Sequence, residues 1–247
     1  MSSDGTEETI DSSELVDTAK IPGDGGELQL FKCDAEYSIS IDGSHTLMST
    51  WAHQSEDALA ELACRKIAGR VQPRVLIGGL GMGFTLAAAL RHLGAEAEVV
   101  VAELVPGVVA WNRGVLGKYA GHPLRDERAT VREGDVAKLL RAQRQAYDAI
   151  LLDVDNGPEG LTRKANDDIY GIDGLRAARA ALRPGGVLAV WASGPNRQFA
   201  NRLNDTGFIV DEVNVRANGK RGGARHVIWI ATNDHAPRVS RSHAAHR

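Results

Sequence analysis

The chain has 247 residues, of which 43% are hydrophobic and 25% are charged. This length accommodates one sizeable α/β domain with a small additional part, and the composition is that of an ordinary globular protein. The formal net charge of −3 gives no electrostatic reason to expect nucleic acid or a membrane surface as a partner.

The cysteines and the N-terminal residues indicate the cellular compartment. Cys33 and Cys64 lie far apart, without the spacing of metal ligands or of a secreted disulfide framework. The first residues are polar and acidic, without the basic start and apolar run of a signal peptide, and no stretch approaches membrane-spanning length. We therefore expect a cytoplasmic protein.

The polar residues 1–24 are predicted to be a disordered tail. Residues 25–70 are predicted to form a small β subdomain followed by a helix. Apolar and polar residues alternate over 27–31 and 37–41, which indicates a small antiparallel sheet. A sheet of so few strands is only marginally stable by itself, so we expect it to pack on the main domain or on a second copy.

The helix that follows is predicted from apolar positions with helical period that end at Gly69, and Ser55 can cap its start. Trp51, His53 and Gln54 lie in the approach to this helix. From there they could cover the ligand edge of the sheet.

Residues 74–113 form the centre of the predicted main domain, which extends over 71–232. A buried strand at 75–77 is followed by a turn with Gly79, Gly81 and Gly83, then by a helix at 84–93 and a strand that ends in Glu103. Glycines let the backbone approach a nucleotide, and an acid about 20 residues on can accept both ribose hydroxyls. The alternative is that the glycines only permit a tight turn. Their compressed spacing suits a nucleoside without a pyrophosphate, such as S-adenosylmethionine (SAM).

Two further strands end in acids. Residues 129–131 are followed by Gly134-Asp135, and residues 147–152 by Asp153. Together with Glu103 these acids predict one shared polar site at the carboxyl edge of a parallel sheet. The alternative for Asp153 is that it only caps a neighbouring turn.

The rest of the main domain is predicted as a loop over the site at 154–170, a helix at 174–182, a turn at 183–186 and a fifth strand from 187 to Trp191. A helix at 199–206 and an antiparallel pair at 208–215 and 227–231 complete it. Residues 233–247 are predicted to be a flexible tail. No metal site is expected, because no rigid element holds the histidines of that tail.

The stretches GGLGMG, VAELVP, EGDV, YDAILLDVDNGP and LRPGGVLAVW, in this order, resemble class I SAM-dependent transferases. More narrowly, residues 25–232 are similar to the spermidine-synthase-like branch. The resemblance implies an α/β fold with a Rossmann-like seven-stranded sheet of order 3-2-1-4-5-7-6 and a small N-terminal antiparallel β domain. It also implies a homo-oligomer, here a dimer, and cofactor contacts from Gly79, Gly81, Gly83, Glu103 and Asp135, to which we add Asp153.

Departures from this pattern favour methyl transfer. Aminopropyltransferases carry an aspartate that helps to select decarboxylated SAM, and Gly81 stands in its place. Asn156 replaces the second acid of their Asp-x-x-Asp-Pro motif, unless the register moves to Asp155. The tyrosine of their Tyr-x-Glu helix is missing, with Ser55 and Glu56 nearby.

Methyl transfer needs in-line positioning, exclusion of water and a base. His53 is the predicted base, with a structural histidine as the alternative, and Asp153 is the second predicted catalytic residue. The residues predicted to bind a small-molecule substrate are Trp51, Gln54, Asp155, Tyr170 and Trp191.

The aromatic residues among these favour a flat acceptor. The sequence is similar to actinobacterial enzymes that methylate carbon 3 of the indole in tryptophan-containing diketopiperazines. The alternatives are an aminopropyltransferase that uses decarboxylated SAM, a nicotinamide-dependent oxidoreductase, which EGDV and RPGG disfavour, and a non-catalytic nucleoside-binding module.

Overall fold

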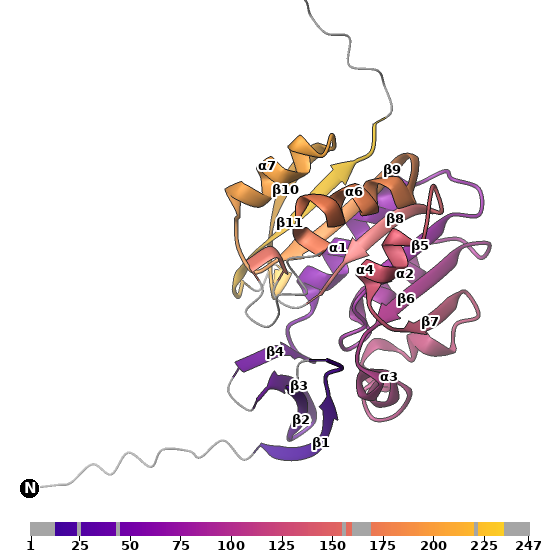
Figure 1. Ribbon diagram of the computed structural model, residues 1–247. Coiled ribbons are helices and arrows are strands. Elements are labelled where there is room, and N and C mark those ends of the chain that lie inside the picture. Colours follow the sequence, from indigo (N-terminus) through magenta and orange to yellow (C-terminus); the bar gives the residue numbers. More distant parts are fainter. Residues whose placement is uncertain are drawn as a thin grey trace, which may run out of the picture.

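The computed structural model describes residues 13–23, 26–42, 45–154, 157–159, 169–219 and 222–234, and it contains two sheets (Figure 1). The smaller sheet is antiparallel, in the order β1-β2-β3-β4. Its strands are β1 (Glu14–Lys20), β2 (Glu27–Cys33), β3 (Glu36–Ile41) and β4 (His45–Ser49). The predicted N-terminal antiparallel sheet is therefore confirmed.

The larger sheet has seven strands in the order β10-β11-β9-β8-β5-β6-β7. Numbered along the chain within this sheet, that order is the predicted 3-2-1-4-5-7-6, read from the β7 edge. Five strands are parallel, and β11 and β10 are added antiparallel at the β9 edge. The strands are β5 (Arg74–Gly78), β6 (Glu98–Glu103), β7 (Ala129–Glu133), β8 (Tyr147–Leu152), β9 (Leu182–Ala192), β10 (Ile209–Arg216) and β11 (Arg225–Thr232).

Helices cover both faces of this sheet because its central strands are apolar on both sides. In β5, Val75 and Ile77 belong to one core cluster and Leu76 to the other. The first cluster includes residues of α1 (Gln54–Lys66), α2 (Phe84–His92) and α3 (Pro106–Arg113), and also of the N-terminal sheet. The second includes residues of α4 (Val136–Arg141), α6 (Ile172–Ala181) and α7 (Arg197–Asp205). Three short 3-10 helices lie in loops: η1 (Gly117–Ala120), η2 (Pro123–Arg125) and η3 (Gly157–Glu159).

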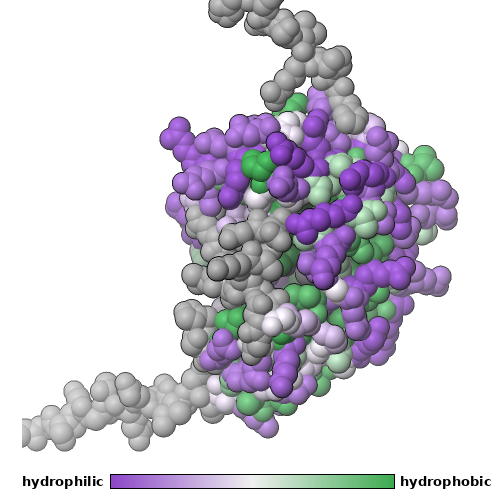
Figure 2. All heavy atoms as spheres, in the orientation of Figure 1, coloured by the Kyte–Doolittle hydropathy of each residue, from purple (hydrophilic) through white to green (hydrophobic). Residues whose placement is uncertain are grey.

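The surface is mostly hydrophilic where α6 and α7 lie, and hydrophobic residues are more frequent toward the centre and the N-terminal sheet (Figure 2). None of the helices in the described part of the chain has the length and apolar character needed to cross a bilayer.

The prediction of a disordered tail over 1–24 is wrong for residues 14–20, which form β1. Ala19 is the only buried residue of this strand, so its sequence carries no strand pattern. The strand is held by partners distant in sequence. It pairs with β2, Asp17 accepts a 2.8 Å hydrogen bond from Trp111 Nε1, and Ala19 packs where a Cβ on Gly107 would lie.

Two further local predictions are corrected. His53, not Ser55, occupies the N-cap position of α1, and Ser55 lies inside the first turn with its hydroxyl bonded to Glu56 and His226. β9 begins at Leu182, before the predicted 187, because Leu182 already pairs with Tyr147 of β8. The register between β8 and β9 then shifts, which takes up the residues predicted as a turn.

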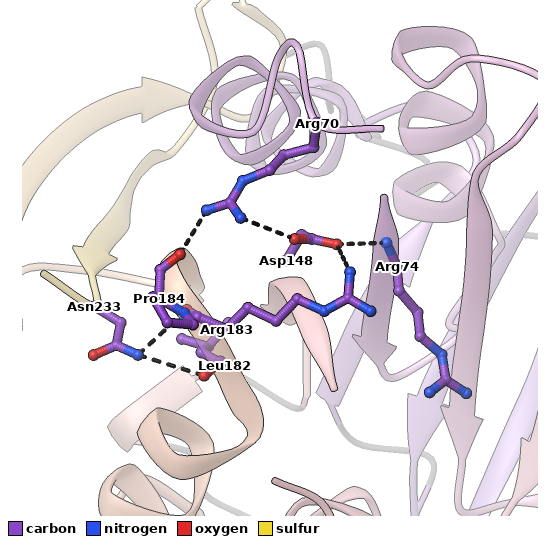
Figure 3. Close-up of polar contacts among 7 residues, drawn as sticks. All are labelled: Arg70, Arg74, Asp148, Leu182, Arg183, Pro184 and Asn233. Carbon is purple, nitrogen blue, oxygen red and sulfur yellow. Dashed lines mark hydrogen bonds and ion pairs between the residues drawn. The ribbon is translucent and has the colours of Figure 1, made fainter. Parts of the chain in front are cut away.

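The buried Asp148 holds together the amino-terminal ends of the parallel strands in the larger sheet (Figure 3). Asp148 is 1% exposed and accepts hydrogen bonds from the backbone N–H of Arg74 (2.9 Å) and from the Arg183 guanidinium (2.7 Å). Arg70 lies 3.5 Å from the same carboxylate and donates to the Pro184 carbonyl (2.6 Å). These contacts tie the segment after α1 to β8 and β9, at the end of the sheet opposite the glycine loop.

Candidate functional site

A cavity of about 420 Å³ opens at the carboxyl ends of β5, β6, β7 and β8. On the sheet side, its lining includes Gly79, Gly81, Glu103, Asp135 and Asp153. The opposite wall comes from the N-terminal sheet and the segment before β2: Ile21, Pro22, Gly23, Leu28, Ile39, Ile41, Leu47 and Met48. The structure therefore brings the three strand-end acids to one cavity, as the sequence predicted.

The backbone of the glycine loop passes close to neighbouring residues, which leaves little room for side chains there. Gly79 has φ +90°, and a Cβ there would lie 2.3 Å from the backbone oxygen of Asp153. Gly81 has φ +52° and faces Met48, whose Sδ would lie 3.0 Å from an added Cβ. Gly83 does not line the cavity. It precedes α2 at φ +84°, where a Cβ would lie 2.8 Å from Asn112 Oδ1, so its role here is backbone conformation and packing.

Glu103 is fixed before any ligand arrives. Its side chain is buried, and its two carboxylate oxygens accept 2.8 Å hydrogen bonds from the backbone N–H groups of Leu80 and Val105. Each carboxylate oxygen can accept more than one hydrogen bond, so Glu103 can also accept hydroxyl groups of a ribose. The loop itself is held by Asn112, whose Nδ2 donates to the Gly81 carbonyl (2.7 Å).

Asp135 caps α4, because its side chain accepts a 2.8 Å hydrogen bond from the backbone N–H of Ala137. It lines the cavity together with Lys138, which lies one helical turn further along α4. The sequence predictions missed Lys138. The size of the cavity, the glycine cradle and the fixed Glu103 carboxylate fit an adenosine-containing cofactor.

A second, smaller cavity of about 50 Å³ adjoins the first. The two share Leu47, Met48, Gly81 and Asp153. The residues that line only the smaller cavity are Ser49, Glu56, Leu80, Met82, Phe84, Thr85 and Trp191. Asp153 thus stands at the wall between the two, where a group could pass from one bound molecule to another.

Two carboxyl groups meet at this smaller cavity. Burial and the nearby charge of Asp153 raise the pKa of Glu56 to about 7, although the Ser55 hydroxyl donates to it at 2.6 Å. Burial also raises the pKa of Asp153, against the opposing effect of a 2.6 Å hydrogen bond from the Thr85 hydroxyl. Burial of both groups and the charge of Asp153 near Glu56 therefore favour protonation of this pair.

His53 lines neither cavity. Its Nδ1 lies 3.0 Å from Asp57 Oδ2, and its ring stacks on Phe84 with the ring centroids 4.0 Å apart. The hydrogen bond to Asp57 raises the pKa of His53, so a larger share of the imidazole is protonated near neutrality than in a free histidine. Phe84 lines the smaller cavity in place of the imidazole.

The predicted substrate-binding residues are dispersed. Trp191 lines the smaller cavity, Trp51 is 51% exposed and lines neither cavity, and Gln54 packs against Gly219. Tyr170 is buried in the core, where its hydroxyl donates to the Val154 carbonyl (3.2 Å) and its ring meets Phe199 edge-on. Asp155 lies outside the described residues.

The sequence predictions also missed Glu56 as a site residue, although a signal was available. The buried positions Leu59, Ala60 and Ala63 define the core-facing side of α1, and Glu56 precedes them by three, four and seven residues. This spacing puts an acid on the apolar side of the helix. Within the part of the chain that the structure describes, no group of three or more His, Cys, Asp or Glu residues could hold a metal ion.

A spermine/spermidine synthase domain matches residues 58–201, which is more than half of the chain. The protein belongs to the spermine/spermidine synthase family. The matched region contains the glycine loop and the three strand-end acids, so the predicted resemblance to spermidine-synthase-like proteins is confirmed.

Two relatives carry different transferase names. Putrescine N-methyltransferase 2 of Nicotiana attenuata is 35% identical over 120 residues, which cover 48% of this chain and 30% of that protein. Polyamine aminopropyltransferase 1 of Streptomyces coelicolor is 32% identical over 123 residues, which cover 49% of this chain and 22% of that protein. The chain thus matches less than a third of the length of either relative, and the family includes transferases of both methyl and aminopropyl groups.

The fold has counterparts among solved structures. The crystal structure of spermidine synthase from Thermotoga maritima matches with a TM-score of 0.71 and 18% identity, over 89% of this chain and 72% of that one. The sheet order and the N-terminal antiparallel sheet are therefore those of the spermidine synthase fold.

Proposed function

We propose that this protein is a SAM-dependent methyltransferase whose acceptor is a small molecule with a basic nitrogen. The observation that carries the proposal is the pair of carboxyl groups, Glu56 and Asp153, at a small cavity next to the larger cavity. Carboxylates attract a protonated amine. A carboxyl group with a pKa near 7 is suited to take its proton.

The larger cavity is the proposed cofactor site. Glu103 would accept the ribose hydroxyls, Asp135 would lie at the adenine, and Gly79 and Gly81 would let the backbone approach the methionine part. When bound, SAM supplies an electrophilic methyl carbon on a positively charged sulfur. The chain's own task is to hold the acceptor against the shared wall, exclude water and remove one proton.

Glu56 is the proposed base and Asp153 the residue that orients the acceptor. An amine reaches the site as an ammonium ion, whose nitrogen has no lone pair available. Transfer of one proton to Glu56 frees the lone pair, and Asp153 keeps a negative charge beside the positive charge that the nitrogen regains on methylation. The names of the putrescine N-methyltransferase and aminopropyltransferase relatives support a polyamine or related amine as the acceptor class.

The choice of SAM over decarboxylated SAM is supported by Gly81. Residue 81 has no side chain and therefore no acid, and the Met48 Sδ lies 3.0 Å from where its Cβ would be. A cofactor carboxylate can therefore approach the loop without repulsion from residue 81.

Titration calorimetry with SAM and with decarboxylated SAM tests this proposal. We expect SAM to bind about tenfold more tightly or better, and turnover with amine acceptors to release S-adenosylhomocysteine. Preference for the decarboxylated form, with methylthioadenosine as the product, would instead make the protein an aminopropyltransferase.

A second candidate acceptor is the indole of a tryptophan-containing diketopiperazine, favoured by the aromatic rings of Phe84 and Trp191 in the smaller cavity. Methylation at carbon 3 would release the indole N–H proton, which Glu56 would accept. Incubation with SAM and cyclic dipeptides should then give products heavier by one methyl group. Unchanged masses, alongside methylation of amines, would eliminate this acceptor.

A further inference from the structure

A chain of three polar side chains leads away from the smaller cavity. Glu56 lines the cavity, and its Oε2 lies 2.6 Å from the hydroxyl oxygen of Ser55. The same hydroxyl oxygen lies 3.0 Å from Nδ1 of His226, which belongs to β11 and is 171 residues away in sequence. Ser55 is 1% exposed, so this hydroxyl has little contact with water.

His226 stands between the cavity wall and solvent. Its ring meets Trp191 edge-on, with the ring centroids 4.6 Å apart, and Trp191 lines the smaller cavity. The imidazole is half-buried and keeps part of its surface exposed. Burial lowers the pKa of His226, so the ring is mostly neutral at neutral pH and can both accept and release a proton.

The charged groups around this chain are identifiable. Asp153 faces Glu56 from the end of β8, and His53 acts on it from the start of α1. The other charged groups near α1 are paired: Asp57 with Arg91 of α2, Lys66 with Asp211 of β10, and Glu61 with Arg65. Arg216 and Arg225, opposite one another in β10 and β11, are exposed next to His226.

We propose that Ser55 and His226 are positioning residues that connect Glu56 to solvent and return it to its unprotonated form after each transfer. This inference rests on the proposed role of Glu56 as the base. Neither residue lines the cavity, so both act through Glu56.

The hydrogen bonds fix the path of the proton. When Glu56 is protonated, its O–H donates to Ser55 Oγ, and the Ser55 hydroxyl donates to an unprotonated Nδ1 of His226. Glu56 then passes its proton to Ser55 while Ser55 passes its own to Nδ1, which forms an imidazolium. Loss of the Nε2 proton to water leaves a neutral Nδ1–H ring that donates to Ser55, which donates to the Glu56 carboxylate. One proton has left, and the base is restored. Before the next transfer the ring turns out of the hydrogen bond, loses its Nδ1 proton to water and takes one from water at Nε2, which restores the starting tautomer.

This path predicts that His226 changes tautomer when Glu56 ionises. We expect ¹⁵N spectra of the imidazole to show the Nε2–H form while Glu56 is protonated and the Nδ1–H form once Glu56 has ionised, with the change centred on the Glu56 midpoint of about 7. Ser55→Ala should abolish this coupled change. It should also raise the midpoint of the Glu56 titration, measured by ¹³C carboxyl spectra, because the carboxylate loses a hydrogen-bond donor. The same His226 tautomer throughout, or an unchanged Glu56 midpoint in Ser55→Ala, would overturn the proposal.

Turnover gives an independent readout. In His226→Asn the amide can still donate to Ser55 but cannot carry a proton, so we expect kcat to fall about tenfold or more, KM to change little, and added imidazole to restore the rate. His92→Asn, an exposed histidine on α2, is the matched control and should keep the full rate. Wild-type kcat in His226→Asn at every pH would also overturn the proposal. The spectra need neither donor nor acceptor, so they decide on this hydrogen-bond chain even if the methyl-transfer proposal fails.

Discussion

Replacing Glu56 by glutamine should reduce activity and increase stability at the same time. The amide has nearly the shape of the carboxyl group and can accept the Ser55 hydrogen bond, but it takes no proton from an acceptor. Loss of a general base costs about 10²–10⁴ in rate, so we expect kcat to fall within that range while SAM affinity is unchanged.

The gain in stability follows from the sign of the pKa change. In the folded protein the pKa of Glu56 is about 7, above its ordinary value of 4.5. Between these values the folded state holds a proton that the unfolded state has released, so the free energy of unfolding falls as pH rises through this range. Above pH 7 the buried charge costs on the order of 3 kcal/mol. Glu56→Gln removes this cost, and we expect its melting temperature to exceed that of the wild type by about 6–12 °C at high pH.

The assays are release of S-adenosylhomocysteine and thermal melting, each measured from about pH 5 to about pH 9. The difference in melting temperature between Glu56→Gln and the wild type should be small near pH 5, where the glutamate is protonated and both side chains at position 56 are neutral. It should grow as the pH rises through 7. Glu61→Gln is the matched control on the same helix, because Glu61 is partly exposed and paired with Arg65. A stability difference that does not depend on pH, or full activity in Glu56→Gln, would refute this reasoning.

Four further changes test other parts of the structure. Asp148→Asn should lower the free energy of unfolding in urea by about 2–3 kcal/mol, since the acid is buried but its arginine partners are partly exposed. Gly79→Ala should abolish SAM binding in calorimetry, because its Cβ would collide with backbone, whereas Gly94→Ala, with open space around it, should bind normally. Glu103→Ala should weaken SAM binding about 100-fold or more in the same assay. Gly81→Asp should shift the measured preference toward decarboxylated SAM by about tenfold.

Each of these predictions has a result that contradicts it. Wild-type urea stability in Asp148→Asn would mean that the arginine contacts stabilise nothing. Equal SAM affinity in the two glycine variants would show that the close approach of the loop to Asp153 is unimportant. Undiminished SAM affinity in Glu103→Ala would move the ribose site elsewhere, and an unaltered cofactor preference in Gly81→Asp would remove the argument from the missing acid.

The sequence by itself determined the main sheet and the half of the site that we propose for the cofactor. Four strands of the parallel sheet, β5, β6, β8 and β9, contain continuous apolar runs, and such runs can be recognised without reference to distant residues. Each acid lies at the end of its strand or within two residues of it, so Glu103, Asp135 and Asp153 could be placed at one edge from the order of the strands along the chain.

Only the tertiary structure decided what lies on the side of the site that we propose for the acceptor. β1 has one buried residue and forms because β2 and α3 hold it, which no local pattern reveals. His53 matched the chemistry expected of a base, but its ring lies against Phe84, and Glu56 faces the cavity instead. Which side chain of a helix reaches a cavity depends on how the helix packs on the sheet. The contact between Ser55 and His226 likewise exists only because α1 and β11 meet in the fold.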